Sequence, residues 1–191
     1  MMFPGNSKIM RYDQIEQDHR SIFLSGITSH TNYFELKNPQ TEIEKAIVEF
    51  LDRQGFGCNK KHAEFWFQQQ VESDSLWPHV DFNDKLRLKL SEGEKIPPEK
   101  LMSPITIACY LQVDDMEGGD LCISHRSWLD YEREIHPVEE LKKELLKYTY
   151  ETFKPMTGDV LYFEGSRWYH WIDTLTQGTR KSMLINFWDE V

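Results

Sequence analysis

Apolar and polar positions divide the chain into a helical beginning and a longer β-rich part. The clearest helix is predicted over 41–54, where the apolar residues recur at spacings of three and four: Ile43, Ala46, Ile47, Phe50 and Leu51. Thr41 and Glu44 form a capping-box pattern at its start, and Gly55 is a natural stop. We interpret residues 1–60 as mainly helical, with an apolar helix face that must pack against a sheet.

From residue 63 onward, short runs rich in β-branched and aromatic residues alternate with turn sequences. Strands are predicted at 64–71, 105–113, 120–124, 150–153, 160–164 and 182–188. One helix interrupts them after Pro137, with an apolar stripe formed by Val138, Leu141, Leu145 and Leu146. Many short strands after a helical start indicate an α+β, mainly β protein built on an antiparallel sandwich or jelly roll. We expect one domain, 1–191, with 1–60 as a helical buttress and 63–191 as the β core.

Composition narrows the class of partner. The chain has 191 residues, with 22 Lys and Arg against 32 Asp and Glu, a formal net charge of −10. Nucleic-acid and polybasic membrane-surface binding both need clustered basic residues, so we expect neither partner. No apolar stretch is long enough to span a membrane, and the first residues do not resemble a secretory signal.

The three cysteines are odd in number and form no CxxC pair, which favours a reducing, cytoplasmic location. We expect Cys109 and Cys122 to be buried as small hydrophobic residues.

Among the seven histidines, His79 stands out because Asp81 follows at i+2. On a strand these two side chains point to the same face, so an imidazole and a carboxylate can share one metal ion. Chance alone produces about one such pair in a chain with this many histidines and carboxylates. A second pair, His62 and Glu64, is interpreted as surface residues bordering a strand.

The C-terminal part distinguishes the two pairs. Residues 158–163 form a turn followed by an apolar strand, His170 comes seven residues later, and Arg180 follows ten residues after that. A second imidazole would complete the two-histidine, one-carboxylate set that suits ferrous iron and leaves coordination positions open. An arginine on a neighbouring strand offers a forked, permanently charged partner for a carboxylate.

In this order, the motifs resemble the 2-oxoglutarate and iron(II)-dependent dioxygenases, in particular their prolyl 4-hydroxylase-like branch. The resemblance covers roughly residues 63 to 188 and is carried by the following segments: His79-Val80-Asp81, residues 107–112, Gly118-Gly119-Asp120-Leu121, residues 158–163, His170 and Arg180-Lys181-Ser182. It implies a double-stranded β-helix, a cupin-like jelly-roll barrel, with the N-terminal helices packed on one sheet.

The resemblance also implies cofactors and roles. His79, Asp81 and His170 would bind Fe(II), and no catalytic residue is expected beyond these ligands. Arg180 would pair with the far carboxylate of the co-substrate 2-oxoglutarate, with Tyr110 and Ser182 beside it. O2 would be the oxidant, and ascorbate would support activity.

Three departures limit what the resemblance implies. Gln112 replaces an asparagine of the family pattern, 82–103 reads as an insertion, and 124–137 is longer than a turn. We expect both loops to flank the barrel mouth, and 82–103 to be a mobile or partly ordered lid. Intact Asp81 favours hydroxylation or another oxidation over halogenation, because related halogenases have a small residue there.

The function therefore expected is hydroxylation of an unactivated C–H bond, in a prolyl or other amino-acid residue of a peptide or protein. A free amino acid or a small biosynthetic intermediate is the alternative substrate. Two other functions remain open on the same scaffold. One is a non-catalytic cupin-like module that binds metal or ligand, and the other is an oxidase that does not use 2-oxoglutarate. The acidic run 114–117 is interpreted as a solvated loop, with a cationic substrate as the less favoured reading.

Overall fold

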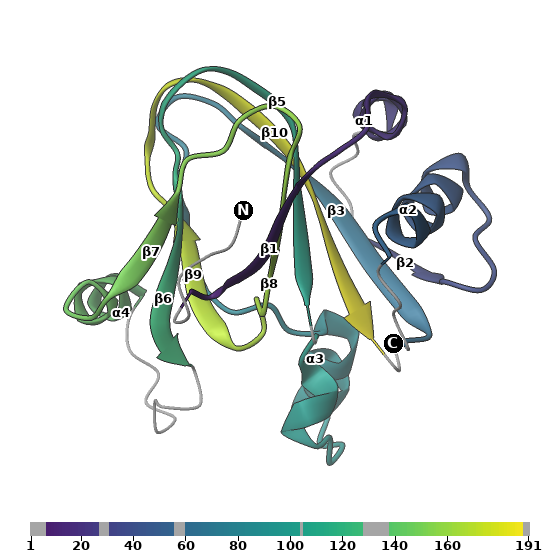
Figure 1. Ribbon diagram of the computed structural model, residues 1–191. Coiled ribbons are helices and arrows are strands. Elements are labelled where there is room, and N and C mark those ends of the chain that lie inside the picture. Colours follow the sequence, from purple (N-terminus) through teal and green to yellow (C-terminus); the bar gives the residue numbers. More distant parts are fainter. Residues whose placement is uncertain (1–6, 27–30, 56–59, 104, 128–137, 189–191) are drawn as a thin grey trace.

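Two antiparallel sheets face each other and form the body of the protein (Figure 1). The computed structural model describes residues 7–26, 31–55, 60–103, 105–127 and 138–188. Within them lie these strands: β1 (Ile9–Gln14), β2 (Asn32–Glu35), β3 (His62–Gln70), β4 (Leu76–His79), β5 (Thr106–Gly118), β6 (Leu121–Ser127), β7 (Tyr150–Phe153), β8 (Asp159–Phe163), β9 (Trp168–Ile172) and β10 (Leu175–Trp188). The helices are α1 (Gln17–Ser25), α2 (Glu42–Arg53), α3 (Asp84–Ser91), the 3-10 helix η1 (Pro98–Leu101) and α4 (Val138–Leu145).

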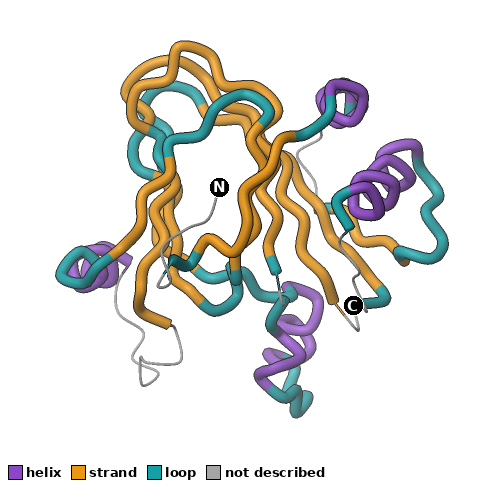
Figure 2. The backbone as a smooth tube through the Cα atoms, in the orientation of Figure 1, coloured by secondary structure: helices purple, strands orange, loops and turns teal. Residues whose placement is uncertain are grey.

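The larger sheet has the order β1-β8-β5-β10-β3-β2 and the smaller one β4-β9-β6-β7. β10 is the longest strand and lies between β5 and β3, so both of its edges are hydrogen-bonded. Figure 2 shows the two sheets curving around a common interior, with the helices outside it. This is the jelly-roll arrangement, and the expected fold class is confirmed.

Side chains on the central strands point alternately to the two faces of the larger sheet, and each face belongs to a different hydrophobic core. On β10, Met183, Ile185 and Phe187 point outward and pack with α1 and α2. The alternate positions of β5 and β8, among them Ala108 and Leu161, point inward between the sheets. Because the side-chain period of a strand is two residues, each sheet residue belongs to one core or the other. The interior face is therefore defined residue by residue.

The predicted helix at 41–54 is confirmed as α2. The Thr41 side chain accepts a hydrogen bond from the Glu44 backbone N–H at 3.2 Å, and the Glu44 carboxylate accepts one from the Thr41 N–H at 3.0 Å. Both halves of the capping box are thus present. Phe50 and Ile47 are fully buried against the larger sheet, as the apolar spacing predicts.

The N-terminal sixty residues contain strands as well as helices. β1 pairs with β8, and β2 pairs with β3, each at an edge of the larger sheet. The prediction of a mainly helical start was therefore incomplete. Neither strand has a long apolar alternation, because edge strands are paired on one side only and keep many polar residues.

The insertion at 82–103 contains α3 and η1. Asn83 Oδ1 accepts a hydrogen bond from the Leu86 N–H at 3.1 Å, and the Asn83 N–H donates to the Leu101 carbonyl at 3.1 Å. At its end, the Ser103 hydroxyl accepts from the Phe187 N–H of β10. The insertion is thus tied to the larger sheet. Of the second expected loop, residues 128–137 lie outside the described residues.

The helix expected after Pro137 is α4. Leu145 is fully buried against Cys122 and Trp171 of the smaller sheet, whereas Leu146 is exposed. Cys109 and Cys122 are free and buried, as expected. Among the described residues, no helix has the length and apolar character needed to cross a bilayer.

Candidate metal centre

Two neighbouring strands of the smaller sheet bring the predicted metal ligands together. His79 ends β4 and is the register partner of His170 on β9. Asp81 follows β4, and its backbone N–H donates to the Gly165 carbonyl at 3.0 Å. The expected side-by-side placement of His79 and Asp81 is therefore present, and β9 adds the third residue.

The three candidate ligand atoms converge. Asp81 Oδ1 lies 3.7 Å from His79 Nε2 and 3.6 Å from His170 Nε2. All three atoms lie within 4.8 Å of one another. Distances of this size allow one ion to touch each atom at about 2 Å, as expected for imidazole and carboxylate ligands.

Backbone carbonyls orient both imidazoles. His79 Nδ1 lies 2.8 Å from the Trp77 carbonyl and His170 Nδ1 lies 3.1 Å from the Trp168 carbonyl. A carbonyl only accepts, so each Nδ1 carries the proton and each Nε2 keeps its lone pair for a metal. Metal-binding histidines are usually oriented in this way.

His170 gives the strongest sign that the site fits a metal. Its Nε2 is buried and accepts no hydrogen bond from any described residue. Burial, and next the charge of His79, lower the pKa of His170 to about 4. A neutral buried imidazole with an unpartnered nitrogen, aimed at a carboxylate, suits a cation.

A hydrogen bond holds the second oxygen of Asp81. The Thr106 hydroxyl lies 2.8 Å from Asp81 Oδ2 and 2.7 Å from Asn186 Oδ1. An ionised carboxylate is the stronger acceptor, so the single hydroxyl proton goes to Asp81. Gly165 completes the enclosure, since a Cβ there would lie 2.4 Å from Asp81 Oδ2. Sequence analysis did not identify Thr106, Asn186 or Gly165, which become neighbours of Asp81 only through sheet register.

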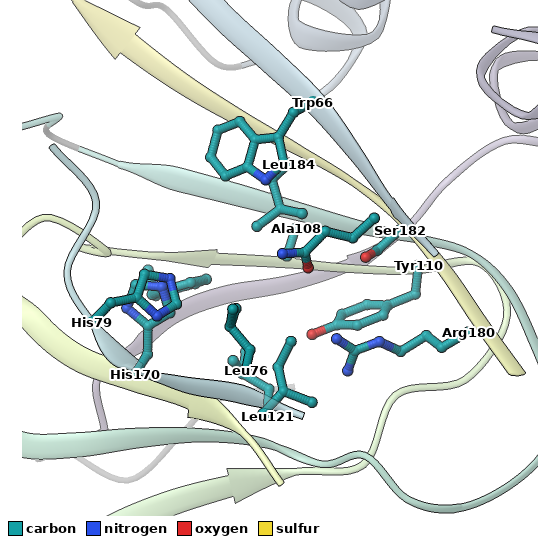
Figure 3. Close-up of a pocket in the computed structure, with 13 residues that line it drawn as sticks. Trp66, Leu76, His79, Ala108, Tyr110, Leu121, His170, Arg180, Ser182 and Leu184 are labelled. Carbon is teal, nitrogen blue, oxygen red and sulfur yellow. The ribbon is translucent and has the colours of Figure 1, made fainter. Parts of the chain in front are cut away.

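Arg180, Tyr110 and Ser182 gather at some distance from the ligands, on the larger sheet (Figure 3). Arg180 is only 2% exposed, and its Nη1 donates to the Gly119 carbonyl at 2.8 Å. Its guanidinium carbon lies 5.4 Å from the centre of the Tyr110 ring. Burial raises the pKa of Tyr110 to about 12, while Arg180 acts against this rise.

A cavity of about 80 Å3 joins the two groups. His79 and His170 line one end, and Arg180, Tyr110 and Ser182 line the other. Between them the walls are mainly apolar: Leu76, Ala108, Leu121, Phe163, Ile172 and Leu184. No ion pair joins Arg180 to a carboxylate of the described residues; burial lowers the pKa of Arg180, and Tyr110 and Asp120 act against that fall.

Two other predictions about polar residues have different outcomes. Glu64 was expected at the surface, and this prediction is wrong. The side chain is only 4% exposed, because the second sheet covers its face of β3. The acidic residues Asp114, Asp115 and Glu117 are exposed and line neither of the two cavities described for this protein. Gln112 also lines neither cavity, and its side chain hydrogen-bonds with Asp114.

Among known proteins, this chain is similar to solved structures but not to any family model or curated sequence. No family model matches the sequence, and no curated protein is similar to it. A Pseudomonas putida prolyl-4-hydroxylase superposes with a TM-score of 0.55 at 13% identity, over 94% of this chain and 85% of that one. The α-ketoglutarate-dependent carbocyclase SnoK of nogalamycin biosynthesis gives 0.55 at 11% identity, over 93% and 79% of the chains.

Iron-bound HygX from Streptomyces hygroscopicus gives a TM-score of 0.51 at 16% identity, over 94% of this chain and 82% of that one. At these identities the likeness shows the fold alone: this chain has the same double-stranded β-helix, or jelly roll, as these three proteins.

Proposed function

We propose that the protein is a non-haem Fe(II) and 2-oxoglutarate-dependent oxygenase. The observation that carries this proposal is one cavity with His79 and His170 of the metal-ligand cluster at one end and the buried Arg180 at the other. Three structural relatives support it: a prolyl-4-hydroxylase, HygX with bound iron, and the α-ketoglutarate-dependent SnoK. The reaction class would be hydroxylation of an unactivated C–H bond.

Residues at the two ends of the cavity would have different roles. His79, Asp81 and His170 would hold the metal on one face, leaving the remaining positions open toward the cavity. When bound, iron with 2-oxoglutarate and O2 supplies the oxidation of an unreactive C–H bond, and ascorbate would support it. Arg180 would bind the distal carboxylate of 2-oxoglutarate through its fork of N–H groups. Tyr110 and Ser182 would donate hydroxyl hydrogen bonds to the same carboxylate.

The apolar walls have a separate role. Leu76, Leu121 and Ile172 exclude water around the middle of the cavity, where a dicarboxylate has its methylene groups. Low polarity there also strengthens the attraction between Arg180 and an incoming carboxylate. The arrangement therefore fits a molecule that is charged at its far end and chelating at its near end.

Arg180 separates this proposal from an oxidase that does not use 2-oxoglutarate, because such an oxidase has no use for the charge. Release of succinate separates it from a non-catalytic cupin-like module, which has no turnover. We further propose a substrate that is an amino-acid residue of a peptide or protein, with a small free molecule as the alternative. The P. putida relative is a prolyl hydroxylase, which favours the first. The free, buried cysteines suit a cytoplasmic location.

Two measurements test the proposal. We expect the purified protein to bind Mn(II), as a redox-stable substitute for Fe(II), and to bind 2-oxoglutarate only when the metal is present. We also expect Fe(II), O2 and 2-oxoglutarate together to release succinate. A protein that binds metal but shows no affinity for 2-oxoglutarate would contradict the proposal in favour of a cupin-like module.

A further inference from the structure

The interior face of the larger sheet carries three rows of side chains across β3, β10 and β5. Strand register sets the rows as Gln68–Ser182–Tyr110, then Trp66–Leu184–Ala108, then Glu64–Asn186–Thr106. The first row lies beside Arg180, at the 2-oxoglutarate end of the small cavity. The second row is largely apolar, and the third is polar and carries a carboxyl group.

A second and larger cavity opens at the third row. Its volume is about 300 Å3, and it is lined by Thr31, Glu64, Trp66, His79, Val80, Asp81, Phe82 and Asn186. It shares Trp66 and His79 with the small cavity. A molecule in it would therefore touch two of the candidate metal ligands from the side away from Arg180.

Glu64 is the charged residue of this cavity that the metal cluster does not use. Its Oε1 accepts a hydrogen bond from Asn186 Nδ2 at 3.3 Å. Its Oε2 is buried and accepts no hydrogen bond of normal distance and angle from any described residue. Burial raises the pKa of Glu64 to about 7, and Tyr33, Asn186 and Trp188 act against that rise. A buried carboxyl oxygen without a donor is costly, and native proteins rarely leave one unsatisfied unless a ligand binds there.

The surroundings favour a cation as that ligand. No lysine or arginine is among the residues that line the cavity in the described part of the chain, so no cationic side chain there pairs with Glu64. An ammonium or guanidinium group would give Oε2 a charge-assisted hydrogen bond. Trp66 and Phe82 add aromatic surface, which attracts cations and packs against the alkyl part of a lysine or arginine.

We propose that the larger cavity is the substrate site and that Glu64 selects a substrate bearing a cationic nitrogen, either ammonium or guanidinium. The identification as a substrate site rests on the proposed function, whereas cation binding by Glu64 does not require the metal. Glu64 would hold the charged group while the rest of the substrate lies against the metal ligands His79 and Asp81.

The test compares probes that differ in charge alone. Nα-acetyl-arginine methylamide and its citrulline counterpart have nearly the same shape, and Nα-acetyl-lysine methylamide is paired with its Nε-acetylated form. Dissociation constants are measured by 1H–15N NMR titration of the full chain, with and without Zn(II). We expect at least one charged probe to bind tenfold or more tightly than its neutral partner, with shifts in the amides of 62–66 and 184–188.

Two variants locate the effect. Glu64→Gln keeps the volume of the side chain and should make the charged and neutral probes bind equally. Glu72→Gln makes the same change of net charge at an exposed position after β3 and should keep the preference. Whichever pair shows the preference distinguishes guanidinium from ammonium.

The proposal is overturned if the unmodified protein binds charged and neutral probes equally, or if Glu64→Gln keeps the preference. The first comparison needs no variant, so a folding defect in Glu64→Gln would not rescue the proposal. A protein that prefers the cation but binds neither metal nor 2-oxoglutarate would contradict the proposed function and not the role of Glu64.

Discussion

Asp81 is held by groups that lie far from it in the sequence. Its Oδ2 accepts from Thr106 on β5, and its N–H donates to Gly165 in the turn between β8 and β9. These contacts fix the carboxylate so that Oδ1 faces both imidazoles. Groups that orient a ligand usually matter to metal affinity although they never touch the ion.

We predict that Thr106→Val weakens metal binding by about 10- to 100-fold, because the valine keeps the shape and removes the donor to Asp81. The measurement is a competition titration of Mn(II) or Zn(II) against a chelator. Thr176→Val, at an exposed position, is the control and should bind as the unmodified protein does. Equal affinity in the two variants would mean that Thr106 does not orient Asp81.

The Glu64 carboxyl should make stability depend on pH. Burial raises its pKa from 4.5 to about 7, so the folded state resists losing this proton and the unfolded state does not. The ionised form is therefore disfavoured in the folded state, and the resulting loss of stability grows from about pH 4.5 to pH 7 and is complete above it.

We predict that Glu64→Gln raises the free energy of unfolding of the ligand-free protein above pH 7 by up to about 3 kcal/mol relative to its effect at pH 4. Denaturant unfolding at pH 4, 6 and 8 measures this difference. A difference that is the same at all three pH values would show that Glu64 has an ordinary pKa.

At the scale of elements, the sequence predicted those helices and strands whose apolar spacing and capping residues lie within the element itself. α2 has apolar spacing and a capping box within its own sequence, and β3, β5, β8 and β10 have dense apolar runs, so all were predicted. The polar parts of β5 after residue 113 and of β10 before residue 182 were not predicted. Nor were β1, β2, β4 and β9. β1, β2 and β4 are edge strands, and β4 contains Pro78, which cannot donate to a ladder.

We predict that Thr41→Ala lowers the free energy of unfolding by about 1 kcal/mol, because it removes the N-cap oxygen of α2. Urea denaturation at neutral pH measures the loss. The same variant should keep the metal affinity of the unmodified protein, because α2 packs on the outer face of the larger sheet. Weakened metal binding would show that the helical layer acts on the interior.

At the scale of the whole molecule, the sheets put opposite charges at the two ends of one interior. Arg180 lies at one end and Glu64 at the other, with the metal cluster on the facing sheet. The motif order predicted that His79, Asp81 and His170 meet, and it placed Arg180 near them. It could not show that Glu64 is buried, because burial of that face depends on a second sheet that β3 never pairs with.

We predict that Arg180→Ala weakens 2-oxoglutarate binding by roughly 30- to 1,000-fold, equivalent to about 2–4 kcal/mol for a lost buried charge pair. Calorimetric titration of the metal-loaded protein measures this affinity. Metal affinity itself should not change, because Arg180 contacts none of the three ligands. Unaltered 2-oxoglutarate affinity would place the co-substrate elsewhere.

The long strand β10 also fixes the distance between the two ends of the interior. Arg180 and Asn186, the neighbour of Glu64, are six residues apart on it, about 20 Å at the rise of an extended strand. Both edges of β10 are bonded, so this length cannot stretch. The co-substrate and substrate must together match a fixed span. The combined length of the bound molecules, and not only their charge, thus becomes a property that the backbone selects.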